Sequence, residues 1–149
     1  MSGTLFDTNI WIAAVFSSHP FHSAATQALQ QASTAEPAIF CRTTQQSFLR
    51  LASTPAILKV YGATGFTNRD ALVALRALQA LPQVSVKDEA PGTVSLWHSL
   101  SALNSASPKV WMDAYLAAFA ITANLSLATL DRDFRNFVGQ GLDLTLVNP

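Results

Sequence analysis

Three aspartates, Asp7, Asp113 and Asp131, occupy positions in the sequence that are typical of functional carboxylates. Asp7 ends a short apolar run, and Asp131 comes two residues after another such run, residues 125–129. Asp113 lies on the apolar stripe of a helical pattern, where a carboxylate is costly unless it is paired, hydrogen-bonded or bound to metal. Three acids meeting at one rim favour a hard divalent cation such as Mg²⁺. Such a cation lowers the pKa of a bound water and neutralises charge on a phosphate, which suits phosphodiester hydrolysis.

Simpler roles remain open for two of these acids. Asp7 precedes a helical pattern and has the residue type of a helix N-cap. Asp113 has Lys109 four residues before it, so a solvated or ion-paired acid is the alternative. His19 and His22 lack a third zinc ligand and are interpreted as surface or rim residues.

The segments that must position these acids alternate between short apolar runs and helical patterns. Helical stretches long enough for crossover connections separate the strands, which predicts a mostly parallel sheet of about five strands with helices on both faces. Ligands bind such sheets beyond the carboxyl ends of the strands, where Asp7 and Asp131 are expected. The fold class is therefore α/β, with one domain over residues 1–149. The expected strands cover residues 4–6, 38–41, 84–86, 125–129 and 142–147.

Composition narrows the possible functions further. Half of the 149 residues are hydrophobic and 12% are charged, which excludes intrinsic disorder. Nine basic residues balance nine acidic ones, which excludes nucleic-acid binding by bulk charge alone. The single Cys41 cannot form an internal disulfide, the first residues lack a basic signal-peptide region, and the longest apolar run, residues 114–121, is too short to span a membrane. A cytoplasmic protein without a membrane partner is expected.

Four segments in order resemble the motifs of PIN domains, and in particular of VapC toxins from type II toxin–antitoxin systems. Residues 5–12 (LFDTNIWI) resemble the opening motif, and residues 111–120 (WMDAYLAAFA) resemble the late acidic helix. Residues 128–134 (ATLDRDF) resemble the closing acidic turn, and residues 41–51 (CRTTQQSFLRL) resemble a branch of that group. The resemblance spans the chain and implies a PIN-like domain with endoribonuclease activity that depends on Mg²⁺ or Mn²⁺, with one or two metal ions.

The resemblance also implies roles for individual residues. Asp7 and Asp113 would be the principal metal ligands, Asp131 would complete the catalytic cluster, and Asp133 would assist it or cap the following turn. Thr8 and Asn9 would hold the Asp7 carboxylate, and Thr129 would do the same for Asp131. RNA contacts are expected from four arginines near these motifs: Arg42, Arg50, Arg132 and Arg135.

One departure from the family pattern concerns the helix after the second strand. Many PIN domains carry a glutamate there, whereas this chain has Gln45, Gln46 and Ser47 at the candidate positions. We expect weaker metal binding than a four-acid site would give, and which of these residues replaces the glutamate stays open.

The aromatic residues and the partners are the remaining expectations. Trp11, Phe16 and Phe21 are interpreted as core rather than as base-stacking residues. The apolar excess favours exposed patches for partners, and the resemblance implies a homodimer, a cognate antitoxin that supplies an arginine, and a larger assembly of the two.

Two rival functions come from other classes. Residues 6–9 superficially resemble the first motif of haloacid-dehalogenase-like phosphatases, but that chemistry requires a second aspartate where Asn9 stands. The missing glutamate favours the stronger rival, a degenerate PIN domain that only binds RNA or a protein.

Overall fold

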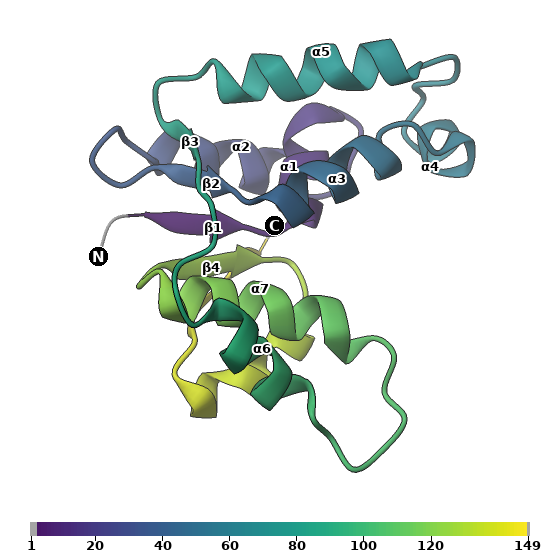
Figure 1. The fold of residues 1–149 in the computed structure, drawn as a ribbon. Helices are drawn as coiled ribbons and strands as arrows, with labels where there is room; N and C mark the ends of the chain where they lie inside the picture. Colours follow the sequence, from purple (N-terminus) through teal and green to yellow (C-terminus); the bar gives the residue numbers. More distant parts are fainter. Residues whose placement is uncertain (1–2, 149) are drawn as a thin grey trace.

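A five-stranded parallel sheet forms the centre of the computed structural model, which describes residues 3–148 (Figure 1). The strand order is β3-β2-β1-β4-β5, and every neighbouring pair is parallel. The sequence-based prediction of an α/β fold with about five mostly parallel strands is therefore confirmed. The strands are β1 (Thr4–Phe6), β2 (Ala38–Phe40), β3 (Val84–Val86), β4 (Ser126–Thr129) and β5 (Asp143–Leu146).

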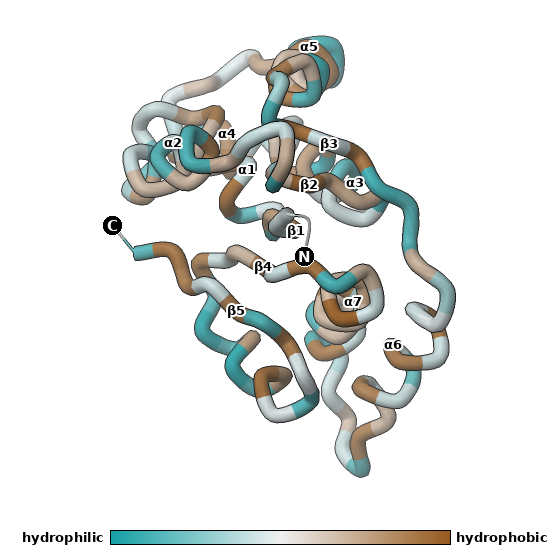
Figure 2. Tube along the Cα trace, turned by 90° about the vertical axis from the view of Figure 1, so that its left-hand side faces the viewer, coloured by the Kyte–Doolittle hydropathy of each residue, from teal (hydrophilic) through white to brown (hydrophobic). Residues whose placement is uncertain are grey.

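Helices cover both faces of this sheet, as the two perpendicular views show (Figures 1 and 2). One face carries α1 (Thr8–Val15), α2 (His22–Gln31), α3 (Arg42–Leu51), α4 (Pro55–Val60) and α5 (Asn68–Gln79). The other face carries α6 (Thr93–Ser101), α7 (Val110–Thr122) and a 3₁₀ helix, η1 (Arg132–Gln140).

The two-residue period of the strands divides the core between these faces. Phe6, Phe40 and Ala128 pack with the α1–α5 group, whereas Leu5 and Leu127 pack against α7 and η1. Successive strand side chains point to opposite faces, so strands buried on both faces read as continuous apolar runs. Helices above and below therefore leave the carboxyl ends of the strands as the place where polar side chains gather.

Trp11 fixes α1 against the strand that precedes it. Its indole Nε1 donates a hydrogen bond of 3.1 Å to the Phe6 carbonyl oxygen, and its ring stacks on Phe40 with centroids 3.8 Å apart. Trp11 and Phe16 are buried and Phe21 is partly buried against the same core, which confirms their interpretation as core residues. The link from Trp11 to β1 holds the turn at Asp7, which joins the strand to the helix.

Two helices were not predicted from the sequence. The sequence Ser53-Thr54-Pro55 predicts a break in the chain rather than a helix. Pro55 nevertheless begins α4, because proline is well suited to the first turn of a helix. The sequence predicts only a short turn before Phe134, whereas residues 132–140 form η1. Its buried residues, Phe134 and Phe137, are three apart, which matches the three-residue period of a 3₁₀ helix.

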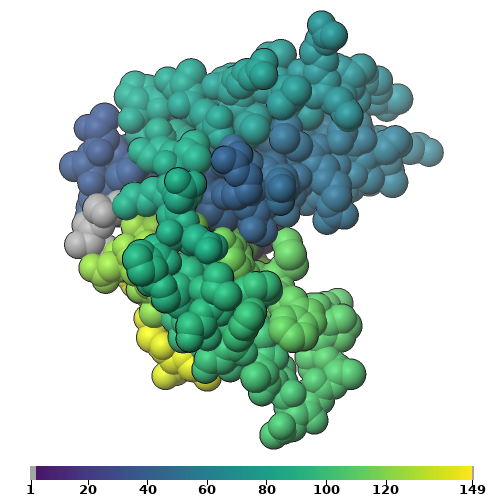
Figure 3. All heavy atoms as spheres, in the orientation of Figure 1, coloured from purple at the N-terminus to yellow at the C-terminus, as the bar shows by residue number. Residues whose placement is uncertain are grey.

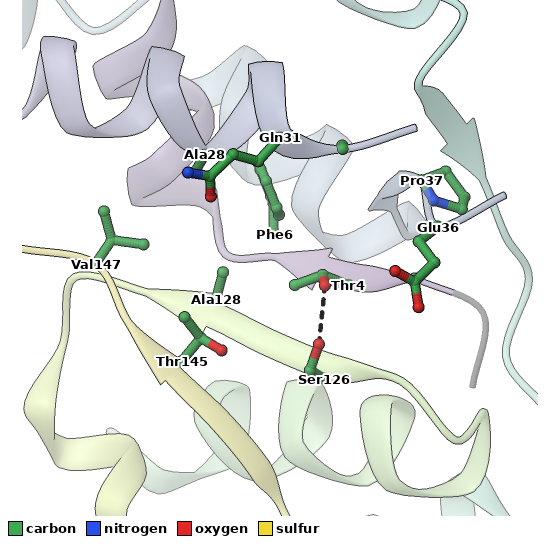
Figure 4. A pocket seen from close by; sticks show the side chains of 12 residues that line it. Thr4, Phe6, Ala28, Gln31, Glu36, Pro37, Ser126, Ala128, Thr145 and Val147 are labelled. Carbon is green, nitrogen blue, oxygen red and sulfur yellow. Dashed lines mark hydrogen bonds between the residues drawn. The ribbon is translucent and has the colours of Figure 1, made fainter. Parts of the chain in front are cut away.

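A cavity of about 360 Å³ lies between α2 and the sheet, at the face of β1 and β4 that includes the hydrogen-bonded pair Thr4 and Ser126 (Figure 4). Thr4 and Ser126 stand at the amino ends of their strands, so this end of the cavity lies away from the carboxyl edge. Within residues 3–148, no helix has the length and apolar character needed to cross a membrane.

Candidate active site

The carboxyl edge of β1 and β4 is the centre of the candidate site. Phe6 pairs with Ala128 in the parallel register, and the backbone N–H of Asp7 donates to the Ala128 carbonyl at 2.9 Å. Asp7 follows Phe6 and Thr129 follows Ala128, so Asp7 and Thr129 lie side by side at the ends of the two strands. In the space-filling view the surface is hollowed on the side toward which β1 runs, between the α3–α5 half and the chain around residues 100–115 (Figure 3).

The carboxylate of Asp7 is held by two donors. Its Oδ1 accepts the backbone N–H of Thr8 at 2.7 Å, which makes Asp7 the N-cap of α1, and its Oδ2 accepts the Thr129 hydroxyl at 2.7 Å. The capping role that the sequence left open is therefore real. Burial raises the pKa of Asp7 and the charge of Asp131 adds to the increase, while the two hydrogen bonds oppose it.

The hydroxyl of Thr129 serves Asp7 rather than the Asp131 carboxylate that the resemblance assigned to it. It donates to Asp7 and accepts two hydrogen bonds, from Asn9 Nδ2 at 3.3 Å and from the Asp131 backbone N–H at 3.0 Å. One donor and two acceptor sites are the full capacity of a hydroxyl. The correction follows from strand pairing, which places Thr129 beside Asp7, whereas only the backbone of Asp131 lies within reach.

Thr8 and Asn9 act differently from the expected pair of side-chain donors to Asp7. Thr8 contacts the Asp7 carboxylate through its backbone N–H, and its side chain is buried. Asn9 bonds to Thr129 and accepts the Leu130 backbone N–H at 3.3 Å through Oδ1. Asn9 thus joins α1 to the end of β4 and positions Asp7 indirectly.

Asp113 lies in the first turn of α7 and is partly buried. Its pKa is raised to about 6, first by burial and then by the charges of Asp7, Asp131 and Asp133. Burial and the three negative charges all raise this pKa, whereas an ion pair with Lys109 would lower it. The alternative of an acid neutralised by Lys109 is therefore not supported. Four aspartates from three separate parts of the chain therefore share one electrostatic environment.

The remaining two acids stand at the start of η1. Asp131 is its N-cap, because the Asp131 Oδ1 accepts the Asp133 backbone N–H at 2.9 Å. Asp133 is exposed in the first turn of the same helix. The cap of η1 is thus Asp131, and Asp133 contributes its charge and its backbone amide.

The donor set suits a hard cation, although it does not form a complete cage. Within residues 3–148, no group of three or more His, Cys, Asp or Glu side chains is arranged to hold a metal ion. Mg²⁺ usually takes one or two protein carboxylates and fills its other positions with water and substrate phosphate. The raised pKa values of Asp7 and Asp113 fit that pattern, because a divalent cation would offset the repulsion between the carboxylates.

The helix after β2 offers no acid in place of the missing glutamate. Gln45 is engaged: its Nε2 donates to the Cys41 carbonyl at 3.3 Å and its Oε1 accepts from Gln79 at 3.2 Å. Gln46 is exposed and Ser47 partly buried. The amide of Gln45 therefore connects α3 with the backbone of Cys41 and with α5.

The four arginines all lie on exposed positions of two helices. Arg42 begins α3 directly after β2, and Arg50 lies in its last turn. Arg132 and Arg135 belong to η1, which Asp131 caps. These positions leave the guanidinium groups available for phosphate.

A cavity beside Asp113 escaped prediction from the sequence. It has a volume of about 470 Å³ and lies among the end of α6, the start of α7 and η1. Its wall includes Asp113 and Asp133 together with Lys109, Asn136 and Gln140. The spacing of residues 133, 136, 137 and 140 is helical and would have indicated one face of a helix, had η1 been recognised.

Three further polar side chains have structural hydrogen bonds. The Tyr115 hydroxyl donates to Glu89, and burial together with this bond raises the pKa of Tyr115. His19 accepts the Phe21 backbone N–H, and His22 bonds to the Ala13 carbonyl, so both histidines stabilise the turn between α1 and α2.

Comparison with known proteins indicates the family of this chain independently of the site geometry. The family model described as "PIN domain" matches residues 4–139. The chain is 40% identical over 141 residues to "Ribonuclease VapC41" of Mycobacterium tuberculosis, which covers 94% of this chain and 97% of that protein.

Solved structures agree on the fold. VapBC2 from Rickettsia felis, bound to a promoter DNA fragment, matches with a TM-score of 0.66 and 14% identity over 97% of this chain and 98% of that one. VapC20 of M. tuberculosis, described as a sarcin-ricin loop cleaving toxin, matches with a TM-score of 0.63 and 17% identity over 99% of this chain and 100% of that one.

Proposed function

The chain belongs to the PIN-domain family, and on that premise we propose that it is a VapC-type endoribonuclease dependent on Mg²⁺ or Mn²⁺. The observation that carries the proposal is the grouping of Asp7, Asp113 and Asp131, whose charges act on one another at the carboxyl edge of the sheet. When bound, the metal would lower the pKa of an attacking water and neutralise charge on the phosphate.

Each aspartate has a distinct part in this proposal. Asp7 is the best oriented ligand, because Thr8 and Thr129 each donate a hydrogen bond to one of its carboxylate oxygens. Each of these oxygens keeps a further lone pair that is available to a metal ion. Asp113 is the second principal ligand, since a cation would favour the ionised form that burial now disfavours. Asp131 and Asp133 add negative charge and complete the cluster.

The decisive experiment compares RNA cleavage by the wild type and by Asp113→Asn in Mg²⁺, in Mn²⁺ and with EDTA. Cleavage by the wild type with either metal, lost with EDTA and in the variant, is the expected result. Asp143→Asn is the matched control, because Asp143 is exposed and begins β5 at the opposite end of the sheet. Equal cleavage by wild type and Asp113→Asn would contradict the proposal.

A second function is favoured by the state of Gln45. α3 contains no acidic residue and therefore adds no negative charge to the cluster, and the Gln45 amide is already bonded to Cys41 and Gln79. A PIN domain that only binds RNA or protein is therefore the alternative. A wild type that is inert in both metals and still binds single-stranded RNA would establish that function instead.

We further propose a cognate antitoxin as partner, in line with the toxin–antitoxin complexes among the structural neighbours. An arginine of the partner would pair bidentately with the carboxylates of Asp7 and Asp113. Trp111 and Met112, each about half exposed and directly before Asp113, offer adjacent apolar surface. Co-expression with a cognate antitoxin should give a complex that no longer cleaves RNA.

The chain is also proposed to form a homodimer, which joins the antitoxin in a larger assembly. Exposed apolar side chains such as Val60, Val73 and Leu103 support an additional interface. Light scattering after gel filtration should give twice the chain mass of 16.0 kDa. A single-chain mass at all concentrations would contradict this part of the proposal.

A further inference from the structure

The cavity beside Asp113 has a composition unlike that of the carboxylate cluster it adjoins. Leu100, Leu103, Val110 and Phe137 give it apolar walls, while Asn136 and Gln140 add two neutral amides. Its volume of about 470 Å³ lies within the range of small-molecule sites, which combine apolar surface with a few polar groups that fix orientation. The lining therefore suits a flat, neutral group with a polar edge.

The position of the cavity connects it to the proposed chemistry. Asp113 belongs both to the cavity wall and to the carboxylate cluster, and Asp133 lies on the same wall. A nucleic-acid strand whose phosphate lies at Asp113 thus has its neighbouring nucleotide at the mouth of the cavity. Two carboxylates on the wall disfavour an anion inside, so the phosphate would stay at the rim and the uncharged part of the nucleotide would enter.

The walls are held in place by contacts between α6 and α7. The Trp97 indole Nε1 donates to the Trp111 carbonyl at 2.8 Å, and the Trp97 ring meets Tyr115 edge-on with centroids 5.5 Å apart. Phe137 is buried in the core under η1, so the floor is equally fixed. A preformed cavity loses little entropy when it accepts a ligand.

We propose that this cavity receives one unstacked base of the RNA strand, next to the phosphate that is cleaved, and that Asn136 and Gln140 read its edge. The proposal rests on the endoribonuclease function proposed above and adds a specificity site to it. Proteins read single-stranded RNA by splaying bases out and hydrogen-bonding their edges, and asparagine and glutamine amides offer paired donors and acceptors for this purpose. Lys109, exposed at the rim, is available for the adjoining phosphate.

Two pairs of variants test the cavity. Ser107→Trp fills it, and Ser105→Trp is the matched control, because Ser105 is exposed outside the cavity and the two hydroxyls bond to each other at 2.9 Å. Asn136→Leu removes an amide from the wall, and Asn104→Leu removes one from the neighbouring exposed loop. Circular dichroism melting checks that all four variants fold.

The first readout is binding, measured in the Asp7→Asn background so that hydrolysis does not interfere. The probe is a pool of labelled single-stranded RNAs of random sequence, on the order of twelve nucleotides long, followed by fluorescence anisotropy. Ser107→Trp is expected to weaken binding about tenfold relative to Ser105→Trp, the loss of one base contact. Equal affinities would overturn the inference whether or not the wild type cleaves RNA.

The second readout is the base preference of cleavage, from sequencing the ends produced from the same pool. Asn136→Leu should flatten the preference at one position beside the cut, while Asn104→Leu should leave it unchanged. An unchanged preference in Asn136→Leu would overturn the inference and leave the nuclease function standing. If Ser107→Trp spares RNA binding but weakens the antitoxin complex, the cavity is a protein-docking site and the inference is wrong.

Discussion

Asp113 is partly buried close to three other aspartates, and its charge state should change the stability of the protein. Its folded-state pKa of about 6 lies above the ordinary value of 3.8, so the folded protein binds this proton more tightly than the unfolded chain does. The resulting stabilisation is fully present below pH 3.8 and is lost as the pH rises through about 6.

We therefore expect Asp113→Asn to raise the free energy of unfolding at pH 7.5 in EDTA by roughly 1 kcal/mol. The full shift would imply more, but solvent screens this partly exposed side chain. Urea titrations of both proteins at pH 7.5 and at pH 4 provide the measurement. The difference should shrink at pH 4, and a difference independent of pH would contradict the electrostatic cause.

Thr129 is the residue on which the geometry of Asp7 most depends. Thr129→Val removes the hydroxyl that donates to Asp7 and accepts from Asn9 and from the Asp131 backbone, leaving three polar groups short of a partner. We expect a loss of about 2 kcal/mol in the free energy of unfolding and weaker cleavage. Thr129→Ser keeps the hydroxyl and should retain most cleavage. Similar cleavage rates in the two variants would show that the hydroxyl does not position Asp7.

Among the elements, η1 depends most on tertiary packing, because 3₁₀ hydrogen bonds have poorer geometry than those of an α-helix. Its two buried aromatic residues, Phe134 and Phe137, anchor it to the core under α7. Phe134→Ala should therefore cost about 3–5 kcal/mol in the free energy of unfolding. Val138→Ala, at an exposed position of the same helix, is the control and should change stability far less.

Prediction from sequence succeeded where a periodic pattern was long and failed where an element was short. Residues 71, 72, 75 and 78 form an apolar stripe at helical spacing, and Thr67 with Asp70 matches a helix N-cap, so the sequence itself predicts α5. In the structure, Thr67 and Asp70 exchange hydrogen bonds in a capping box. The six residues of α4 and the two buried aromatics of η1 give too little pattern to identify a helix. Because η1 was not recognised, the cavity beside Asp113, of which η1 forms one wall, was not predicted either.

The same limit applies to contacts within the site. Residue types and positions singled out Asp7, Asp113 and Asp131 as candidates, since an acid on an apolar stripe or at a strand end is unusual. The partner of the Thr129 hydroxyl depends on the pairing of β1 with β4, two strands that are far apart in the chain. No local pattern encodes that pairing, so the hydrogen bond of Thr129 was assigned to Asp131 instead of Asp7.

At the scale of the whole molecule, a net charge of zero must be reconciled with binding of a polyanion. The negative cluster repels RNA, so attraction has to come from a few cations placed nearby rather than from an overall field. The proposed contributors are the four exposed arginines Arg42, Arg50, Arg132 and Arg135. With few phosphate contacts, the RNA affinity should depend only weakly on salt concentration, because each contact to a single strand releases less than one counterion.

If each of the four arginines neutralises one phosphate, the logarithm of the RNA affinity should fall with the logarithm of salt concentration with a slope of about −3. Replacing Arg132 with glutamine should reduce that slope by about 0.7. Anisotropy titrations of Asp7→Asn with single-stranded RNA across a range of salt concentrations give both values. Arg76→Gln is the control, because Arg76 lies in the last turn of α5, and it should leave the slope unchanged. A slope unaffected by Arg132→Gln would show that Arg132 does not contact an RNA phosphate.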